Sequence, residues 1–321
     1  MSKKKIQWGI LGLGNISGRF AQSLSNSKNG ILYGAASYTQ YKREDFKEKY
    51  SSVNIYDNYY DLLKNPNIDV VYIALPHADH YKWSKEALSN GKAVLCEKPA
   101  TLSYQETLEL CNLSKEKNLV FMEAMKTRFI PAITEIKKAL ADGVIGDIKR
   151  VETSFCGQAK FREGSYMFDK KQGGSLYDTG NYNIASILDY IHANIIEIKP
   201  HVEYKYGVDS YDNIELVFDS KQTARIEVGL DRTKERTLNI IGAKGTITSV
   251  NFYRPEAFTI QLNNGESTII KKPYIQDDFF GEIEEIHSCI NNHSYESKRM
   301  SHQNSLDCIK LLEMIKNSIN S

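Results

Sequence analysis

The chain has 321 residues, more than one hydrophobic core usually holds, so its length predicts two domains. Its 41 basic and 40 acidic residues nearly cancel, and no long block of like charge occurs, which argues against a nucleic acid as a partner. Five cysteines without CxxC or metal-ligand spacing, no secretory leader and no apolar run of about 18 residues favour a cytoplasmic protein with reduced thiols and no membrane segment.

The first predicted element is an apolar strand, Ile6–Leu11, which runs into a glycine-rich turn. Ile16, Phe20 and Leu24 then recur on one helical face. A glycine turn between a strand and a helix is typical of a dinucleotide site, because glycine lets a pyrophosphate approach the backbone and the helix N-terminus supplies amide donors. The residues of this turn that we expect to bind the cofactor are Gly12, Gly14, Asn15 and Ile16.

A second strand, Ile31–Ser37, ends without the acidic residue that would bind the ribose hydroxyls of NAD. The cofactor contacts expected there are Ser37, Tyr38 and Arg43, so a 2′-phosphate would meet a cation instead of a carboxylate. The cofactor is therefore NADP or NAD, and this pattern favours NADP. The alternative stays open that Lys42–Asp45 is only the solvated face of a helix.

A third strand, Asp69–Leu75, is apolar almost throughout, as expected of a strand buried on both faces. The residues at its end are Leu75, Pro76, His77 and His80. We expect them to line the cofactor crevice, because ligands bind at the carboxyl ends of parallel strands. A metal is not expected there, since no third ligand has suitable spacing. A helix is expected over residues 81–90.

A fourth apolar strand carries Glu97-Lys98-Pro99 at its carboxyl end, and Ser103-x-x-Glu106 forms a capping box that begins the next helix. This position predicts cofactor contacts for Glu97 and Lys98. A surface lysine in a strand-to-helix turn is the alternative, and the Lys98–Pro99 bond can be cis or trans. With a further strand at Leu119–Glu123, the alternation predicts an α/β fold whose residues 1–123 form a doubly wound parallel Rossmann sheet that binds NAD(P).

From residue 124 onward, alternating runs joined by turn signals predict an α/β domain with an open, mainly antiparallel sheet over 124–321. A helix over Pro131–Asp142 precedes this sheet, and two amphipathic helices close the chain. The predicted strands are Val151–Phe155, Ile214–Phe218, Thr223–Leu230, Thr237–Ile241, Thr246–Val250, Ala257–Leu262 and Ser267–Lys271.

Within the second half, Gly173 and Gly174 turn the chain into a helix that carries Asp178 and Tyr182, which share one helical face at this spacing. Gly180 between them costs ~1 kcal/mol against alanine inside a helix. Its presence indicates that something approaches the backbone closely there. A capping aspartate and an ordinary half-buried tyrosine are the alternative interpretation.

Taken in order, three motifs resemble the glucose–fructose oxidoreductase/inositol dehydrogenase/MocA (Gfo/Idh/MocA) family over nearly the whole chain. They are the Gly12-x-Gly14 turn, Glu97-Lys98-Pro99, and Gly173-Gly174 leading to Asp178-x-Gly180. The run from Glu123 to Phe129, together with Tyr182, looks most like the dihydrodiol/xylose dehydrogenase branch of that family. Three positions depart from the family's pattern, namely Tyr38, His77 and Lys126.

The resemblance implies a Rossmann domain followed by a substrate-binding and oligomerisation domain, whose open sheet pairs copies into a homodimer or homotetramer. It also implies that Lys98 is catalytic and that Tyr182 is the acid/base. A nearby ammonium favours the phenolate form of a tyrosine, so we expect Lys98 to act on Tyr182 and Asp178 to orient Lys98 and contact the substrate. These groups from the two domains are expected to converge on one cleft.

The expected protein is an NAD(P)-dependent dehydrogenase or reductase that transfers hydride between nicotinamide and a CH–OH or carbonyl group of a sugar, polyol or diol. Candidate substrate contacts are Arg128, Phe161, Arg162 and Tyr166. An interdomain salt bridge of Arg128 and packing of a lid by the aromatic residues are the alternatives. Two other functions stay open, an NAD-dependent glycoside hydrolase of the same fold and a non-catalytic nucleotide-binding sensor.

Overall fold

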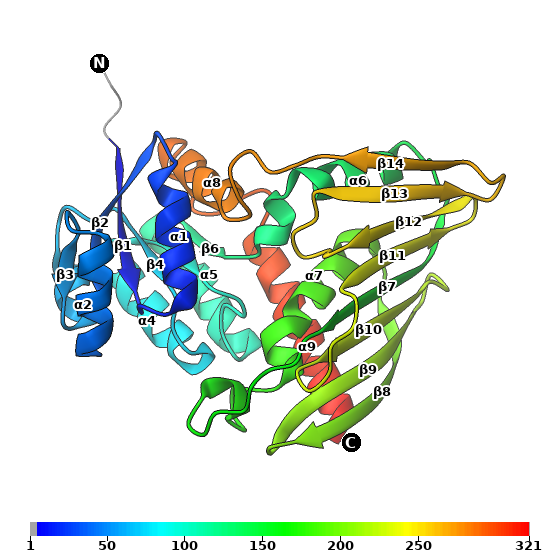
Figure 1. Cartoon of the computed structure of the whole chain (residues 1–321), viewed down its shortest axis with the longest axis horizontal. Helices are drawn as coiled ribbons and strands as arrows, with labels where there is room; N and C mark the ends of the chain where they lie inside the picture. Colours follow the sequence, from blue (N-terminus) through cyan, green and yellow to red (C-terminus); the bar gives the residue numbers. More distant parts are fainter. Residues whose placement is uncertain (1–4, 321) are drawn as a thin grey trace. The chain divides into compact units, whose positions relative to one another are not determined.

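The computed structural model describes residues 5–320 and divides into two compact units (Figure 1). Unit 1 comprises the described residues up to Met125 together with Ile275–Leu306. Unit 2 comprises Lys126–Tyr274 and the described residues from Asp307 onward. The last helix, α9 (His302–Asn320), therefore contributes to both units. The assignment of cofactor binding to residues 1–123 and of substrate binding to 124–321 stays a prediction.

Six parallel strands form the sheet of unit 1, in the order β3-β2-β1-β4-β5-β6. This is the strand order of a doubly wound Rossmann fold, with its reversal between β1 and β4. The predicted parallel sheet is thereby confirmed. Strands β4 and β5 are buried at every residue, which explains why their sequences are apolar without alternation. The strands are β1 (Ile6–Leu11), β2 (Gly30–Ala36), β3 (Asn54–Tyr56), β4 (Val70–Ile73), β5 (Ala93–Cys96) and β6 (Phe121–Glu123).

Two helices of unit 1, α3 and α5, begin at a residue whose side chain caps the first turn. Asn58 accepts a hydrogen bond from the amide of Asp61, and Ser103 accepts one from the amide of Glu106, as the predicted capping box requires. The helix expected over 81–90 begins earlier, at His77, directly after Pro76, whose side chain makes no cap hydrogen bond. The helices are α1 (Asn15–Ser25), α2 (Gln40–Lys49), α3 (Tyr59–Lys64), α4 (His77–Ser89), α5 (Tyr104–Lys117) and α8 (Phe280–Asn291).

Helix α8 comes from the end of the chain but packs with the start of unit 1. The indole nitrogen of Trp8 donates to Nε2 of His287 over 2.8 Å, and both side chains are buried. Nδ1 of His287 lies 3.2 Å from Glu284, whose carboxylate also accepts from Ser27. Ile283 and Ile286 of α8 are fully buried, and each such side chain contributes roughly 1.5–3 kcal/mol, so α8 is part of the core of unit 1.

Unit 2 is built on an eight-stranded sheet in the order β14-β13-β12-β11-β7-β10-β9-β8. Neighbouring strands in this sheet run antiparallel, except β7 and β10, which run parallel to each other. This confirms the predicted, mainly antiparallel sheet. Strand β8 was not expected, because it is a polar edge strand that contains Pro200. The strands are β7 (Ile148–Cys156), β8 (Ile195–Lys205), β9 (Val208–Phe218), β10 (Thr223–Gly229), β11 (Thr237–Gly242), β12 (Gly245–Val250), β13 (Ala257–Leu262) and β14 (Ser267–Lys271).

One face of this sheet is covered by α7 (Asn181–Tyr190), which lies against β7 and β10 (Figure 1). The side-chain amide of Asn183 donates to the hydroxyl of Thr153 on β7 and to the carbonyl of Glu227 on β10. Unit 2 also contains a short 3₁₀ helix, η1 (Lys126–Phe129), and α6 (Pro131–Ala141), with Pro131 in its first turn as predicted.

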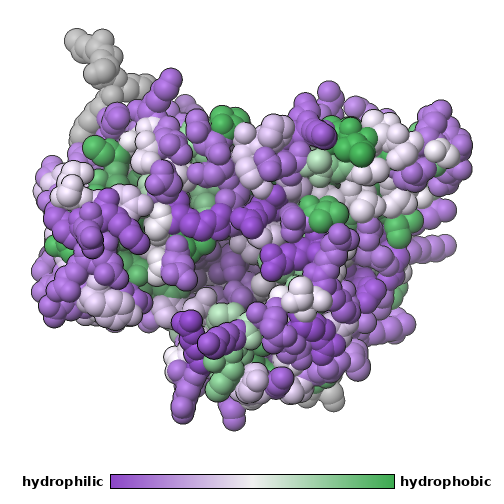
Figure 2. Space-filling view, viewed as in Figure 1, coloured by the Kyte–Doolittle hydropathy of each residue, from purple (hydrophilic) through white to green (hydrophobic). Residues whose placement is uncertain are grey.

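Polar side chains dominate the face of the molecule seen in Figure 2, where apolar side chains are scattered and do not form one patch. Across residues 5–320, no helix is both long enough and apolar enough to cross a membrane. All five cysteines lie in this part of the chain, where they are buried and form no disulfide.

Candidate functional site

The glycine turn of unit 1 has the geometry of an anion cradle. Gly12 has φ +91°, and a Cβ there would overlap the carbonyl oxygen of Ala74, so no other residue fits. A Cβ on Gly14, in contrast, would meet nothing within 4 Å, which leaves the backbone open to a ligand. Gly14 is the N-cap of α1, whose first turn contains no acidic residue. The turn, with Asn15 and Ile16, therefore fits the pyrophosphate of a dinucleotide.

The end of β2 presents a cation instead of a carboxylate. Nη1 of Arg43 donates to the carbonyl oxygen of Ser37 over 2.8 Å, so the guanidinium is held at the strand end. In the part of the chain that the structure describes, Arg43 forms no ion pair. Tyr38 is exposed, and its ring centroid lies 4.5 Å from that of Tyr59.

The loop after β4 is held by a fully buried histidine. Nδ1 of His80 lies 2.7 Å from the carbonyl oxygen of Pro99, and Nε2 lies 2.8 Å from that of Leu75. Burial lowers the pKa of His80, although the two carbonyls oppose this shift. His80 thus ties the loop after β4 to the loop after β5. His77 is also buried, with its ring 5.8 Å from that of His80.

The Glu97-Lys98-Pro99 segment follows β5 directly, at the carboxyl edge of the sheet. Glu97 accepts a hydrogen bond from the hydroxyl of Tyr72 over 2.5 Å. The Lys98–Pro99 peptide bond is cis, and the amide of Ala100 donates to Glu123. Lys98 is half-buried. The segment therefore lies at the same edge as the glycine turn, as the sequence predicted.

In unit 2, a buried pair of carboxyl groups fixes the start of the segment that carries Asp178 and Tyr182. The hydroxyl of Ser175 lies within hydrogen-bond distance of both Asp209 and Asp212, and the amide of Leu176 donates to Asp209 over 2.9 Å. Gly174 has φ +99°, and a Cβ there would overlap the carboxylate of Asp209. Gly174 is thus required by the packing of Asp209 against the turn, whereas Gly173 is required because a Cβ there would overlap the carbonyl oxygen of Met167.

The helix that carries the two predicted catalytic residues is irregular at its start. Leu176–Gly180 form a π-turn, η3, so the regular α-helix expected to contain Asp178 begins only at Asn181. Such π-turns are frequent at functional sites. The group that approaches Gly180 is the side chain of Leu176, 2.9 Å from an added Cβ, which explains this glycine without a ligand. Asp178 is half-buried and Tyr182 is buried.

Tyr182 packs among aromatic side chains of the sheet that sequence reasoning missed. Its ring centroid lies 5.8 Å from that of Phe155, at the end of β7, and 5.6 Å from that of Tyr253, after β12. The rings of Phe155 and Tyr253 are 4.6 Å apart. Phe155 belongs to the predicted alternation of β7, but nothing local in the sequence links it to Tyr182 or Tyr253.

The four predicted substrate contacts have structural partners or are exposed. Arg128 is buried and forms an ion pair of 2.9 Å with Asp189 of α7, within unit 2. The ring of Phe161 stacks on that of Tyr206 at 4.3 Å. Arg162 is exposed, and Tyr166 begins a 3₁₀ turn, η2 (Tyr166–Phe168). Phe161 therefore anchors its loop to the turn between β8 and β9.

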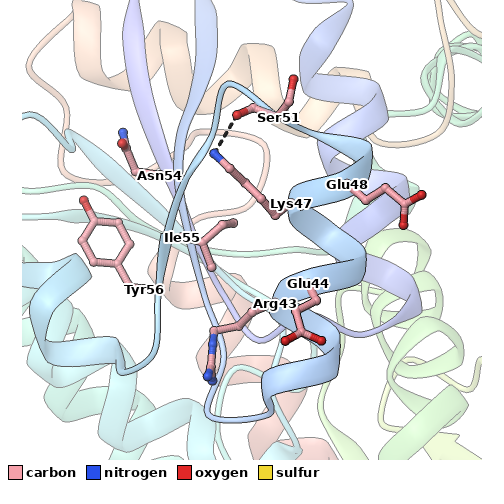
Figure 3. A pocket seen from close by; sticks show the side chains of 8 residues that line it. All are labelled: Arg43, Glu44, Lys47, Glu48, Ser51, Asn54, Ile55 and Tyr56. Atoms are coloured by element: carbon pink, nitrogen blue, oxygen red, sulfur yellow. Dashed lines mark hydrogen bonds between the residues drawn. The ribbon is translucent and has the colours of Figure 1, made fainter.

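A depression of about 840 Å³ lies on unit 1, between α2 and β3 (Figure 3). Its lining mixes both signs of charge, and the ammonium of Lys47 donates to the carbonyl of Ser51. The lining residues are Arg43, Glu44, Lys47, Glu48, Ser51, Asn54, Ile55 and Tyr56. The glycine turn does not contribute to this lining. Across residues 5–320, no group of three or more metal-ligating side chains occurs.

A Rossmann sheet with an open glycine turn has the architecture of a dinucleotide-binding domain. Two family models match the chain in this order. The oxidoreductase family with an NAD-binding Rossmann fold matches residues 6–125, and the GFO/IDH/MocA C-terminal domain matches residues 133–248. The chain belongs to the Gfo/Idh/MocA family, which confirms the resemblance of its motifs, and it is an NAD(P)-dependent oxidoreductase.

Characterised relatives match nearly the whole chain. It is 29% identical over 315 residues to scyllo-inositol 2-dehydrogenase (NADP(+)) IolU of Bacillus subtilis, covering 96% of this chain and 95% of the relative. It is 29% identical over 318 residues to a trans-1,2-dihydrobenzene-1,2-diol dehydrogenase of Danio rerio, covering 94% of this chain and 92% of the relative. The fold is that of KijD10, a 3-ketoreductase from Actinomadura kijaniata, with a TM-score of 0.89, 22% identity and 98% of each chain covered.

Proposed function

We propose that the chain is a dehydrogenase or reductase that acts on a CH–OH or carbonyl group of a sugar, polyol or diol. The observation that carries this proposal is the setting of Tyr182, a buried tyrosine that follows an irregular helix start and packs on two aromatic rings. The names of the relatives, which are NADP-dependent inositol and xylose dehydrogenases and dihydrodiol dehydrogenases, support the substrate class.

In the proposed reaction, a bound nicotinamide accepts or supplies the hydride, and the protein binds, orients and moves one proton. Tyr182 takes the proton from the substrate hydroxyl, or gives it back to the carbonyl oxygen in reverse. A phenol in water releases its proton only near pH ~10. Tyr182 therefore needs a nearby cation that favours its phenolate form. We assign that role to Lys98 and the orientation of Lys98 to Asp178.

We further propose NADP as the preferred cofactor. Gly12, Gly14, Asn15 and Ile16 would hold the pyrophosphate, and Arg43 with Ser37 would hold the 2′-phosphate. The open space above Gly14 and the position of Arg43 support this fit. The loop residues from Leu75 to His77, and Glu97, would line the nicotinamide side, while His80 acts indirectly by holding that loop. Assembly of copies through the eight-stranded sheet is a further proposal, and multi-angle light scattering tests it.

The decisive experiment compares Lys98→Met and Tyr182→Phe with the wild-type protein on a panel of polyols, aldoses and diols. Both variants should lose turnover by about two to four orders of magnitude, as expected for loss of acid/base chemistry, while still binding NADPH. Tyr190→Phe is the matched control, because it removes a buried hydroxyl from the same helix. Near-normal turnover by either variant contradicts the assignment.

Two other outcomes identify the alternative functions. Release of sugar from a glycoside without net change in nicotinamide absorbance indicates the hydrolase. Tight cofactor binding without turnover of any compound indicates the sensor.

A further inference from the structure

Three cationic side chains of unit 2 surround the ring of Tyr253. Its centroid lies 5.1 Å from Cζ of Arg254, 5.6 Å from Cζ of Arg236 and 5.8 Å from Nζ of Lys126. Arg236 is also 4.6 Å from the ring centroid of Phe155. Tyr253 and Phe155 are the two rings against which Tyr182 packs, so this positive charge gathers beside the proposed acid/base.

Arg236 differs from the other arginines of the sheet in its electrostatic partners. Arg150 pairs with Glu215 at 2.7 Å, Arg225 with Glu227 at 3.2 Å and Arg232 with Glu203 at 2.5 Å. The guanidinium of Arg236, in contrast, interacts with two aromatic rings and one hydroxyl, and within residues 5–320 it forms no ion pair with a carboxylate. Two ring faces and one hydroxyl offer this half-buried guanidinium no full negative charge, which an anion beside it would supply.

The packing around Arg236 holds its guanidinium in one place. Nη1 donates to the hydroxyl of Tyr253 over 3.1 Å, which leaves the phenol proton and further guanidinium N–H groups available to a ligand. Gly157, directly after β7, leaves room for the guanidinium, since a Cβ there would lie 3.1 Å from Nη2. The hydroxyl of Thr127 donates to the carbonyl of Tyr253 and fixes the turn that carries this ring.

We infer that the substrate of the proposed oxidoreductase carries an anionic group, a carboxylate or a phosphate ester, which binds to Arg236 and the Tyr253 hydroxyl. The inference rests on the proposed function and narrows its substrate class. A planar guanidinium fork matches both anions, since each presents two oxygens at the right spacing.

The first test measures binding without turnover. Inorganic phosphate and acetate are titrated by calorimetry at low salt into the protein saturated with NADP, so that the cofactor's own phosphate sites are filled. At least one of these anions should saturate a single site in the wild type, and Arg236→Gln should lose this binding by tenfold or more. Arg236→Lys should keep part of it, and Arg232→Gln, which removes a Glu203-paired arginine, should keep all of it. Absence of an anion site that depends on Arg236 overturns the inference.

The second test measures turnover of matched substrates, namely aldoses, the corresponding uronates and the corresponding sugar phosphates. An anionic member should have a kcat/KM at least tenfold above its neutral partner, and whether it is a uronate or a phosphate identifies the anion. Arg236→Gln should raise KM for that member with little change in kcat, and should lower kcat/KM for the anionic member at least tenfold more than for its neutral partner. Preference for neutral sugars overturns the inference that the substrate is anionic, but not the proposal that the protein is an oxidoreductase that acts on sugars. Anion binding without turnover of any compound overturns the proposed function but leaves Arg236 as an anion site.

Discussion

The indole N–H of Trp8 donates to Nε2 of His287 over 2.8 Å, between residues that are 279 positions apart in the sequence. Nε2 must therefore be the acceptor, and Nδ1 carries the proton that faces Glu284. Uptake of a second proton on Nε2 would break the contact with Trp8. Burial lowers the pKa of His287, which is the direction expected for a histidine held neutral.

This arrangement predicts acid-dependent stability. The unfolded chain binds a proton on His287 near pH ~6.5, while the folded protein binds it only at lower pH. The unfolded state therefore holds more protons below that pH, and stability falls as pH falls, by up to about 1.4 kcal/mol per pH unit. Urea unfolding followed by tryptophan fluorescence between pH 5 and 8 should show this slope. His287→Gln should flatten it and exposed His192→Gln should not. An unchanged slope in His287→Gln contradicts the assignment.

The opposite pH dependence is expected from the carboxyl pair of unit 2. Burial, and then the nearby charge of Asp209, raise the pKa of Asp212 to about 8, while Lys316 opposes the shift. The folded protein therefore holds a proton that the unfolded chain releases near pH ~4, and stability falls as pH rises between these values. Asp212→Asn should keep the fold and remove this fall in urea unfolding, whereas Asp142→Asn, at an exposed helix end, should not. A fall that persists in Asp212→Asn would contradict the assignment of this proton to the carboxyl pair.

Gly174→Ala should be far more damaging than a comparable glycine substitution. Gly174 and Gly265 have φ of +99° and +95°, but an added Cβ would overlap Asp209 at the first and meet nothing within 4 Å at the second. Gly265→Ala should therefore cost only the backbone strain, about 1–2 kcal/mol. Gly174→Ala should lower the free energy of unfolding, measured with urea, by at least twice this amount. It should also reduce turnover. Equal losses in the two variants would show that the contact with Asp209 is unimportant.

The two glycines of the cofactor turn should separate folding from binding. Gly12→Ala should prevent folding of unit 1, because its Cβ would overlap the Ala74 carbonyl, while Gly14→Ala should fold normally. If the pyrophosphate lies against Gly14, the new methyl group should raise the Kd of NADPH by at least about tenfold, or 1.4 kcal/mol. Gly18→Ala is the matched control, since its Cβ also meets nothing within 4 Å. Unchanged NADPH fluorescence titrations for Gly14→Ala would exclude this binding mode.

Arg43→Gln should change cofactor preference without affecting the fold. Loss of the guanidinium at the end of β2 should raise the Kd of NADP by about tenfold or more, equivalent to about 1.4 kcal/mol, with little change in the Kd of NAD. Lys42→Gln, which removes a neighbouring charge of the same helix, should leave both values nearly unchanged. If both variants weaken NADP equally, a diffuse positive surface and not Arg43 binds the 2′-phosphate.

Much of the fold could be predicted because its signals are local. Strand β1 and the glycine turn lie where the sequence predicts them, since neighbouring residues determine both. Strand β3 has only three residues, and β8 alternates weakly at the edge of its sheet, so neither shows a clear pattern. The setting of Tyr182 could not be predicted, because Phe155, Arg236 and Tyr253 come from separate strands and turns that only the folded sheet brings together.

The membership of α8 in unit 1 has a consequence for synthesis of the chain. The partner of Trp8 lies in a segment, Ile275–Leu306, that emerges from the ribosome only after all the strands of unit 2. Helix α8 can therefore pack on the nascent Rossmann sheet only after almost the entire polypeptide has been translated, and until then one side of the sheet stays exposed. Exposed apolar surface in such an intermediate invites aggregation, and a truncated polypeptide that stops before α8 would keep that flank bare permanently.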